Sequence, residues 1–253
     1  MAEETEEQMK RMMKLMMSMI MMVIMIQVMS TMMKTAQAII TPPEEEEEEV
    51  TYEDFTTFTE VDPTDKITVE SPTKVSFTNM TRADACYLYK DYGEGHFGNF
   101  EITCKITVQS CTTTGEAPHC KVIMLSDGIG NDIEDVSNYV DCLITGSKTE
   151  NNKFDLELYK VVGGVATNLD GMAEGYPFTA PKTFYIRLKR DGGTLTMEVY
   201  NDEAMTDLVG SVSGDVSDVP SSFRYLEVAV SRNSTGTDSL SGSIENLRIV
   251  KAS

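Results

Sequence analysis

The chain changes its hydrophobic pattern once, near residue 50. Before this point apolar residues follow one another almost without interruption, and after it apolar and polar residues alternate with a period of two. The first pattern is typical of a helix that is covered on all sides, and the second is typical of half-buried β-strands. We therefore predict a hydrophobic helix over residues 1–40, a linker over 41–49 and a β domain over 50–253.

The N-terminal helix is dominated by methionine. The run LMMSMIMMVIMIQVMSTMM, from Leu15 to Met33, has no charged residue, and thirteen of the eighteen methionines lie in the first 33 residues. Nineteen helical residues span roughly 28 Å, which is close to the ~30 Å hydrocarbon core of a bilayer. Alone in water such a helix would aggregate, so lipid or protein must cover it.

Three coverings are consistent with this segment. The first is a lipid bilayer, and the second is the core of an oligomer or filament in which flexible Met side chains fill the gaps between neighbouring copies. The third is a cleaved signal peptide, because Ala36-Gln37-Ala38 has the form of a cleavage site. The fourteen residues before the apolar run, and the length of the run, favour the first two.

The flanking charges predict an orientation. Lys10, Arg11 and Lys14 precede the apolar run, and Lys34 alone follows it before an acidic stretch. The positive-inside tendency then places the N-terminus in the cytoplasm and the β domain outside.

The linker begins with Thr41-Pro42-Pro43, which ends the helix because proline cannot continue it. Glu44–Glu49 follow, six like charges that are typical of a solvated, self-repelling spacer. A strip that binds cations or a basic partner is the alternative.

The β domain is clearest in Asn99–Gln109, where apolar Phe100, Ile102, Cys104, Ile106 and Val108 alternate with polar residues. Turn sequences separate such segments, as at Asp191-Gly192-Gly193 and Val162-Gly163-Gly164. Ten or more short strands without a convincing helix predict an antiparallel sandwich. The other alternating segments are Lys66–Glu70, Thr73–Thr78, Lys121–Ser126, Asn138–Thr145, Phe154–Val161, Thr183–Lys189, Thr194–Tyr200, Phe223–Ser231 and Ser241–Val250.

Four stretches, Asp54–Met80, Tyr87–Val108, Thr183–Asp202 (TFYIRLKRDGGTLTMEVYND) and Phe223–Val250, carry a family resemblance. They resemble a concanavalin A-like lectin/glucanase or laminin-G-like domain, of the kind common in viral and environmental microbial proteins. The resemblance covers residues 51–253. It implies a mainly β fold, a jelly-roll sandwich of two curved sheets, with the concave face and rim loops as the usual ligand surface.

Catalytic residues are not expected. Glycosidases of this superfamily carry a strand of the type Glu-apolar-Asp-apolar-x-Glu, and Asp155-Leu156-Glu157 is the nearest match. The order differs and Tyr159 and Lys160 occupy the region of the second Glu, so we interpret Asp155 and Glu157 as a solvent-facing pair. Neither histidine, His96 nor His119, has a partner at nucleophile or zinc spacing.

A glycan could stack on aromatic residues at the rim. Tyr89, Tyr92, His96 and Phe97 are the candidates, although ordinary packing around the Gly93-Glu94-Gly95 turn explains them as well. Calcium is a possible cofactor on the loop that carries Asp127, Asn131, Asp132, Glu134 and Asp135, because calcium prefers such oxygen ligands. Asn79 and Asn233 begin glycan acceptor sequences.

The five cysteines lie between Cys86 and Cys142. Cys111 and Cys120 bracket an eight-residue loop that a disulfide could staple, and Cys104 and Cys142 on apolar strand faces could form a bridge across the core. Cys86 is then left over. The alternative is five reduced, mostly buried thiols.

The charge excludes one class of partner. The net charge is −20, with −6 from residues 1–49 and −14 from the rest, so a nucleic acid partner is not expected. Our leading hypothesis is a non-enzymatic display subunit of an extracellular filament or a virion, homo-oligomeric through its helix. A membrane-anchored glycan-binding adhesin is the alternative, and a divergent glycoside hydrolase is a third hypothesis.

Overall fold

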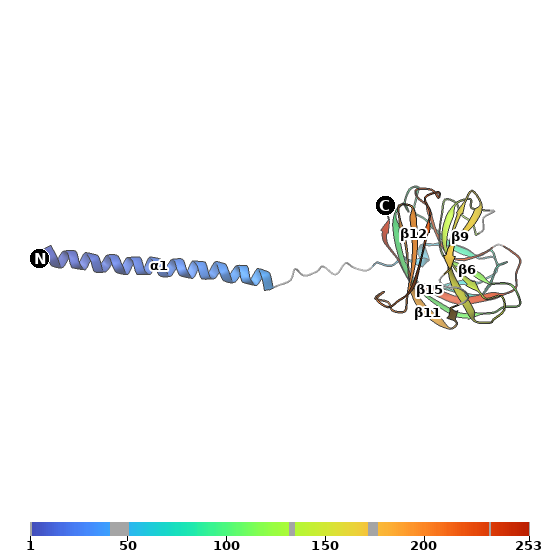
Figure 1. Ribbon diagram of the computed structural model, residues 1–253, viewed down its shortest axis with the longest axis horizontal. Coiled ribbons are helices and arrows are strands. Elements are labelled where there is room, and N and C mark those ends of the chain that lie inside the picture. The colour runs from blue at the N-terminus through green and yellow to red at the C-terminus, as the bar shows by residue number, and fades with distance from the viewer. Residues whose placement is uncertain (1, 41–50, 132–134, 172–176, 233, 253) are drawn as a thin grey trace. The chain divides into compact units, whose positions relative to one another are not determined.

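The chain forms two separate units in the computed structural model, Met1–Val50 and Thr51–Ser253 (Figure 1). Residues 2–40, 51–131, 135–171, 177–232 and 234–252 are described. The predicted linker therefore lies outside the described residues, and each unit is treated by itself.

The first unit is the helix α1 (Ala2–Ile40), which confirms the predicted hydrophobic helix. Its last residue directly precedes Thr41-Pro42-Pro43. The apolar side chains between Met9 and Met33 are 52–70% exposed on every side of the helix. Thr5–Met33 contains an 18-residue window with a mean hydropathy of 2.0, and the segment is long and apolar enough to cross a bilayer.

The second unit is an antiparallel sandwich of two sheets, as predicted (Figure 1). The short helix η1 (Phe55–Thr57) precedes it. Sheet A has the order β1-β4-β14-β6-β7-β8-β10, with β9 paired to β8, and sheet B has the order β13-β12-β11-β5-β15-β3-β2. The strands of sheet A are β1 (Thr59–Val61), β4 (Tyr87–Asp91), β6 (His119–Ser126), β7 (Tyr139–Gly146), β8 (Lys153–Val162), β9 (Val165–Gly171), β10 (Phe178–Thr179) and β14 (Tyr225–Ser231). The strands of sheet B are β2 (Ile67–Ser71), β3 (Lys74–Thr81), β5 (Phe100–Cys111), β11 (Lys182–Asp191), β12 (Thr194–Tyr200), β13 (Leu208–Asp215) and β15 (Ser239–Ala252).

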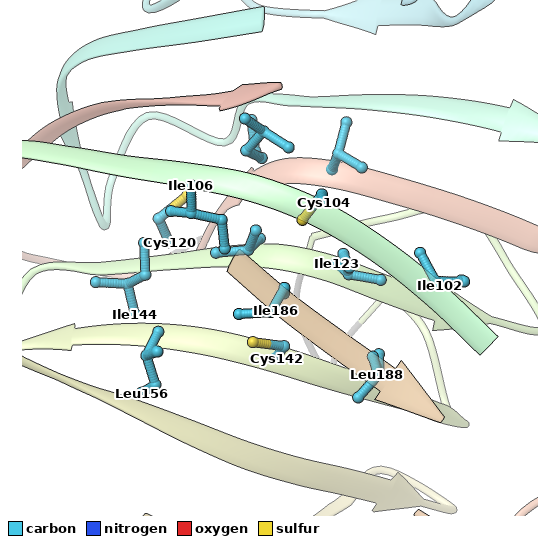
Figure 2. Close-up of a cluster of buried hydrophobic side chains, with 14 of the residues drawn as sticks. Ile102, Cys104, Ile106, Cys120, Ile123, Cys142, Ile144, Leu156, Ile186 and Leu188 are labelled. Carbon is cyan, nitrogen blue, oxygen red and sulfur yellow. The ribbon is translucent and has the colours of Figure 1, made fainter. Parts of the chain in front are cut away.

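The hydrophobic core lies between the sheets and comes entirely from the second unit. Figure 2 shows Ile102, Cys104 and Ile106 of β5 beside side chains of β6, β7, β8 and β11. The polar residues of β5 alternate with this apolar face, as the sequence predicted. The described core residues all lie between Phe55 and Leu247, so the domain 51–253 has a hydrophobic core of its own, as an independently folding domain does.

Sheet A differs from sheet B because its central strands β6, β7 and β14 are buried on both faces. Every residue of β7 is buried, whereas the strands of sheet B alternate between buried and partly exposed residues. We call the face of sheet A that points away from sheet B the outer face. A second, smaller hydrophobic cluster covers part of it, made of Met124, Val136, Tyr139, Val161 and Val230.

The predicted disulfides are not formed: all five cysteines are buried free thiols, which was the alternative. The Cys142 Sγ lies 3.1 Å from the Met197 Sδ. Cys111 instead directs its Sγ to the Lys153 carbonyl at 3.6 Å. Burial raises the pKa of the Cys111 thiol to about 11, and the other four thiols are shifted upward for the same reason, which makes them poor nucleophiles.

A carboxylate holds the loop that the Cys111–Cys120 disulfide was expected to staple. Asp238, which is 1% exposed, accepts hydrogen bonds from the backbone N–H groups of Thr114 and Glu116. The Thr113 and Thr114 hydroxyls donate to the same carboxylate at 3.1 and 2.7 Å. The hydrogen bonds of Asp238 therefore constrain the loop that we had expected a Cys111–Cys120 disulfide to constrain.

This arrangement predicts that Asp238→Ala destabilises the domain 51–253 and that reductant does not. Removing the acceptor leaves buried donors unpaired, so the free energy of unfolding should fall by about 1–3 kcal/mol. These hydrogen bonds outweigh burial and hold the pKa of Asp238 below its ordinary 3.8. The ionised carboxylate therefore stabilises the folded domain above pH 3.8, and this stabilisation is lost as the pH falls through the lowered pKa. Urea titrations with and without dithiothreitol test this, with exposed Glu60→Ala as the matched control. A loss of stability on reduction would instead reveal a disulfide.

Candidate functional site

A pocket of about 80 Å³ opens on the outer face of sheet A. Its lining residues belong to β6, β7, β8, β9 and β14, except Arg232, which directly follows β14. Polar, charged and aromatic side chains dominate its lining, which consists of His119, Lys121, Tyr139, Asp141, Leu143, Tyr159, Ala166, Val230 and Arg232.

Strand register explains why these residues meet. Asp141 pairs with Met124 on one side and with Tyr159 on the other, so the three lie in one row across β6, β7 and β8. Lys121 pairs with Val230 and with Leu143 in a second row. A register shift between Lys121 and Ile123 turns Lys121 to the outer face, while Ile123 remains in the core.

Lys121 is a buried cation in this face, with an exposure of 5%. Its Nζ donates to the Asn131 carbonyl at 3.1 Å and lies 3.8 Å from the Asp141 Oδ2. The same Nζ lies 4.2 Å from the centroid of the Tyr139 ring, a cation–π contact. Lys121 therefore links β6, β7 and the loop that follows β6.

Two buried carboxyl groups accompany this cation. The pKa of Asp141 is raised to about 7. Burial is the main cause, Lys121 opposes it, and nearby Glu157 adds to it. Burial raises the pKa of Glu227 to about 8, against the lowering effect of the Ser126 hydrogen bond.

Ser126 connects Glu227 to Gly128. The Ser126 Oγ lies 2.7 Å from the Gly128 carbonyl oxygen and 2.7 Å from the Glu227 Oε1, to which it donates a hydrogen bond. This hydrogen bond favours the ionised carboxylate and so opposes the effect of burial on the pKa of Glu227.

Several buried polar atoms of this face have no hydrogen-bond partner within the described part of the chain. They are the Asn131 Nδ2, Asp141 Oδ1, Thr145 Oγ1 and Glu227 Oε2. Each buried polar atom without a partner lowers the stability of the fold by roughly 1–3 kcal/mol. Such atoms are therefore rare in native structures, and each one calls for an explanation. Asp141 lines the pocket and Thr145 pairs with His119, so two of the four lie where a bound molecule could supply the partner.

His119 and Tyr159 are both neutral at physiological pH. Burial lowers the pKa of His119 to about 3, and the charges of Arg82, Arg232, Lys148 and Lys121 add to this effect. Burial also raises the pKa of Tyr159, and the neighbouring Glu157 raises it further. The Tyr159 hydroxyl accepts a hydrogen bond from the Asn168 Nδ2 at 3.3 Å.

The predicted aromatic ligand residues divide into two places. Tyr92, His96 and Phe97 form one cluster with ring centroids 4.6–5.0 Å apart. Phe97 is fully buried in the core, so its prediction as a stacking residue is wrong. Tyr89 lies elsewhere, on the outer face of sheet A, where it packs against Tyr225 with ring centroids 6.5 Å apart. None of the four lines the pocket.

The predicted calcium loop is only partly described. Asp127 accepts a hydrogen bond from the Asn138 side chain, Asn131 is buried and Asp135 is exposed. Asp132 and Glu134 lie outside the described residues, and no cluster of three potential His, Cys, Asp or Glu ligands occurs among the rest. The calcium site therefore stays a prediction.

The two predicted glycan acceptors also differ. Asn79 is exposed on β3, although its side chain contacts the Ser241 hydroxyl, and Asn233 lies outside the described residues. Glycosylation at either position stays a prediction.

Sequence reasoning missed most of the pocket. Of its lining residues only His119 was considered for a chemical role, and it was set aside. Asp155 was interpreted as solvent-facing with Glu157, but it is buried, because the outer face to which both residues belong is covered. A usable signal did exist: Lys121, Asp141 and Glu227 are single charges inside otherwise apolar strands. Alternation alone could not show that the three strands are neighbours in one sheet.

Known structures share the fold of this domain. No protein-family model matches the sequence, and no curated protein matches it. The Ca²⁺-bound exoplasmic/lumenal domain of VIP36 matches with a TM-score of 0.52 and 10% identity, over 77% of this chain and 84% of that one. Xylan beta-1,4-xylosidase from Bacillus halodurans C-125 matches with a TM-score of 0.51 and 15% identity, over 83% of this chain and 41% of that one. The GH43 protein BlXynB from Bacillus licheniformis gives 0.51 and 7%, over 82% and 40%. At these identities the matches establish the fold alone.

The two raised pKa values predict how stability depends on pH. The folded domain holds protons on Asp141 and Glu227 that the unfolded chain releases near its ordinary carboxyl pKa. The stabilisation of the folded domain by these bound protons is therefore full at low pH. It is lost as the pH rises toward the pKa values in the folded domain, about 7 for Asp141 and about 8 for Glu227.

Asp141→Asn removes one of these ionisations and mimics the protonated form. The decrease in unfolding free energy between about pH 5 and about pH 8 should then shrink by an amount on the order of 1 kcal/mol or more. Urea titrations of the domain 51–253 at both pH values measure this, with exposed Asp191→Asn as the control. An unchanged pH dependence would contradict the buried titration of Asp141.

Proposed function

We propose that this chain, whose β domain has the concanavalin A-like lectin/glucanase fold, is a membrane-anchored carbohydrate-binding protein without catalytic activity. The observation that carries the proposal is the pocket on the outer face of sheet A, in which the buried Asp141 Oδ1 has no hydrogen-bond partner among the described residues and the Tyr139 and Tyr159 rings line the same space. The helix α1 holds the protein in the bilayer, with the N-terminus in the cytoplasm and the β domain outside.

The chemistry of the pocket suits a sugar ring. A sugar offers an apolar ring face and a rim of hydroxyl groups, so it needs an aromatic or aliphatic wall next to fixed donors and acceptors. Tyr139, Tyr159 and Leu143 supply such walls. Asp141 Oδ1, whose residue lines the pocket, has no hydrogen-bond partner within the described part of the chain and would gain one from a sugar hydroxyl.

The same lining argues for binding without cleavage. Hydrolysis of a glycosidic bond generally uses two carboxyl groups that flank it. Asp141 is the single carboxyl group among the described residues that line the pocket, and it lies beside the Lys121 cation. Glu227 is fully buried and does not reach the pocket.

The helix supports a bilayer as its environment. Its backbone groups are paired within the helix, as lipid requires, and its side chains are apolar all round between Leu15 and Met33. The cations Lys10 and Arg11 lie outside this run and form ion pairs with Glu6 and Glu7 at 2.9 and 3.5 Å. The run of roughly 28 Å matches the ~30 Å hydrocarbon thickness.

Flotation with lipid vesicles tests the anchor. The full chain, reconstituted from detergent into phosphatidylcholine vesicles, should float with them and resist extraction by high salt. Ile24→Asp places a charge at the centre of the apolar run at a cost of about 2.5–3.5 kcal/mol, so a larger share should remain unbound. Met9→Asp, near the charged end, is the matched control and should float like the unchanged chain.

A second candidate is a structural subunit of a filament or virion, in which α1 packs against sister helices. The concentration of thirteen methionines in the first 33 residues favours it, because methionine fills irregular gaps between packed helices. Large ordered polymers in detergent-free buffer, in place of vesicle-bound chain, would support this candidate over the bilayer anchor. A lone soluble monomer would contradict both.

A glycan array tests the binding site. The domain 51–253 should bind a consistent set of sugars, and Tyr159→Ala should weaken that binding on the order of tenfold, because it removes one aromatic wall. Tyr185→Ala removes a tyrosine of similar exposure from sheet B and should leave binding unchanged. Equal losses in both variants, or no sugar bound by the unchanged domain, would contradict the proposed site.

A further inference from the structure

The polar residues of the apolar run gather on one side of α1. A helix turns by about 100° per residue, so positions three and four apart lie on the same side. Gln27, Ser30 and Thr31 have this spacing. Ser18, the remaining polar residue of the run, lies on the opposite side. The second half of the run therefore has one side that differs from the rest.

The apolar residues of this side differ as well. We call it the glutamine face, and within a sector of about 120° it consists of Ile20, Val23, Ile24, Gln27, Ser30 and Thr31. All seven methionines between residues 18 and 33 lie outside this sector. Val and Ile have one strongly preferred rotamer in a helix, so the glutamine face presents a defined surface. Methionine has three rotatable bonds and suits contacts that change, such as those with lipid chains.

Gln27 lies too deep in the run to reach water. The run is centred on Ile24, so Gln27 is about 4.5 Å from the middle of the bilayer and about 9 Å from the end of the run at Met33. Polar side chains reach the headgroup region only near the ends of a span. Its amide group therefore lies in hydrocarbon, where an unpaired polar group is costly.

The helix itself cannot pair this amide. A hydroxyl can return to its own helix, as the Thr31 Oγ1 does when it donates to the Gln27 carbonyl at 2.9 Å. The Gln27 side chain carries two donor hydrogens and one acceptor oxygen, and the backbone groups around it are already bonded within the helix. Within the described part of the chain the amide has no hydrogen-bond partner. Its partner must come from another molecule in the membrane.

We infer that α1 pairs in the bilayer with a second copy of itself, in parallel, through the glutamine face. This inference rests on the bilayer anchor of the proposed function and names the partner of that anchor. Copies inserted in the same orientation hold Gln27 at the same depth. An amide is complementary to another amide, so each Gln27 donates to the side-chain oxygen of the other and both are satisfied.

The spacing of the glutamine face fits such a pair. Ile20, Val23, Gln27 and Ser30 follow one another at intervals of three, four and three residues. This is the repeat along which helices pack in left-handed pairs, both in water and in membranes. The small Ser30 lets the two backbones approach closely.

Energy transfer in vesicles tests the pairing. The full chain, labelled at its N-terminus with a donor or an acceptor dye, is reconstituted into phosphatidylcholine vesicles and should show more transfer than randomly distributed chains. Gln27→Leu removes the amide and keeps the run apolar, so the protein-to-lipid ratio at half-maximal transfer should rise on the order of tenfold. Gln27→Asn keeps an amide and should retain the pairing. Ser18→Leu, on the opposite side, is the matched control and should behave like the unchanged chain.

Cysteine cross-linking in the same vesicles tests which side is paired. Val23→Cys, on the glutamine face, should give a disulfide-linked dimer when copper phenanthroline is added. Met25→Cys lies at nearly the same depth on the opposite side and should give much less. The unchanged chain, whose five thiols are buried, supplies the background.

The outcomes separate this inference from the proposed function. Transfer at the random level, transfer that survives Gln27→Leu, or equal cross-linking at positions 23 and 25 would overturn the pairing while the bilayer anchor stands. If the unchanged chain does not float with vesicles, the anchor fails and the pairing with it.

Discussion

The burial of charge on the outer face of sheet A is the constraint around which the β domain is organised. Lys121 and Asp141 are 5% and 2% exposed, and an ion in such a place loses its hydration. The fold offsets this cost with specific contacts: the Asn131 carbonyl, the Tyr139 ring and the carboxyl of Asp141 all surround one ammonium group. These contacts tie Asn131, Tyr139 and Asp141 to β6, and the last two of these residues line the pocket.

Charged side chains on the outer face of sheet B lie close to solvent and therefore lose less of their hydration. Lys105 and Lys74 share Glu245 on its outer face, at 2.8 and 3.9 Å, and Arg187 pairs with Glu198 at 3.1 Å. These side chains are 20–38% exposed, and ion pairs so close to solvent contribute little to stability. They keep the face soluble and need no further explanation. Among the described residues, sheet A holds more of the buried polar atoms that lack a hydrogen-bond partner, and part of them lie at or beside the pocket, so sheet A is the face where function is expected.

The sequence predicted the fold better than the site, for a physical reason. Alternation marks strands with one buried face, and the ten alternating segments all became strands, including the two flanking Gly192-Gly193. It did not mark β1, β4, β9, β10 or β13, which have few buried side chains among the described residues. The pocket depends on which strands are neighbours: Lys121 and Asp141 are twenty positions apart in the chain and Arg232 is far from both. Pairing brings them together, and a pattern along the chain cannot specify pairing between distant strands. For the same reason the cysteine spacing suggested a staple that Asp238 provides instead.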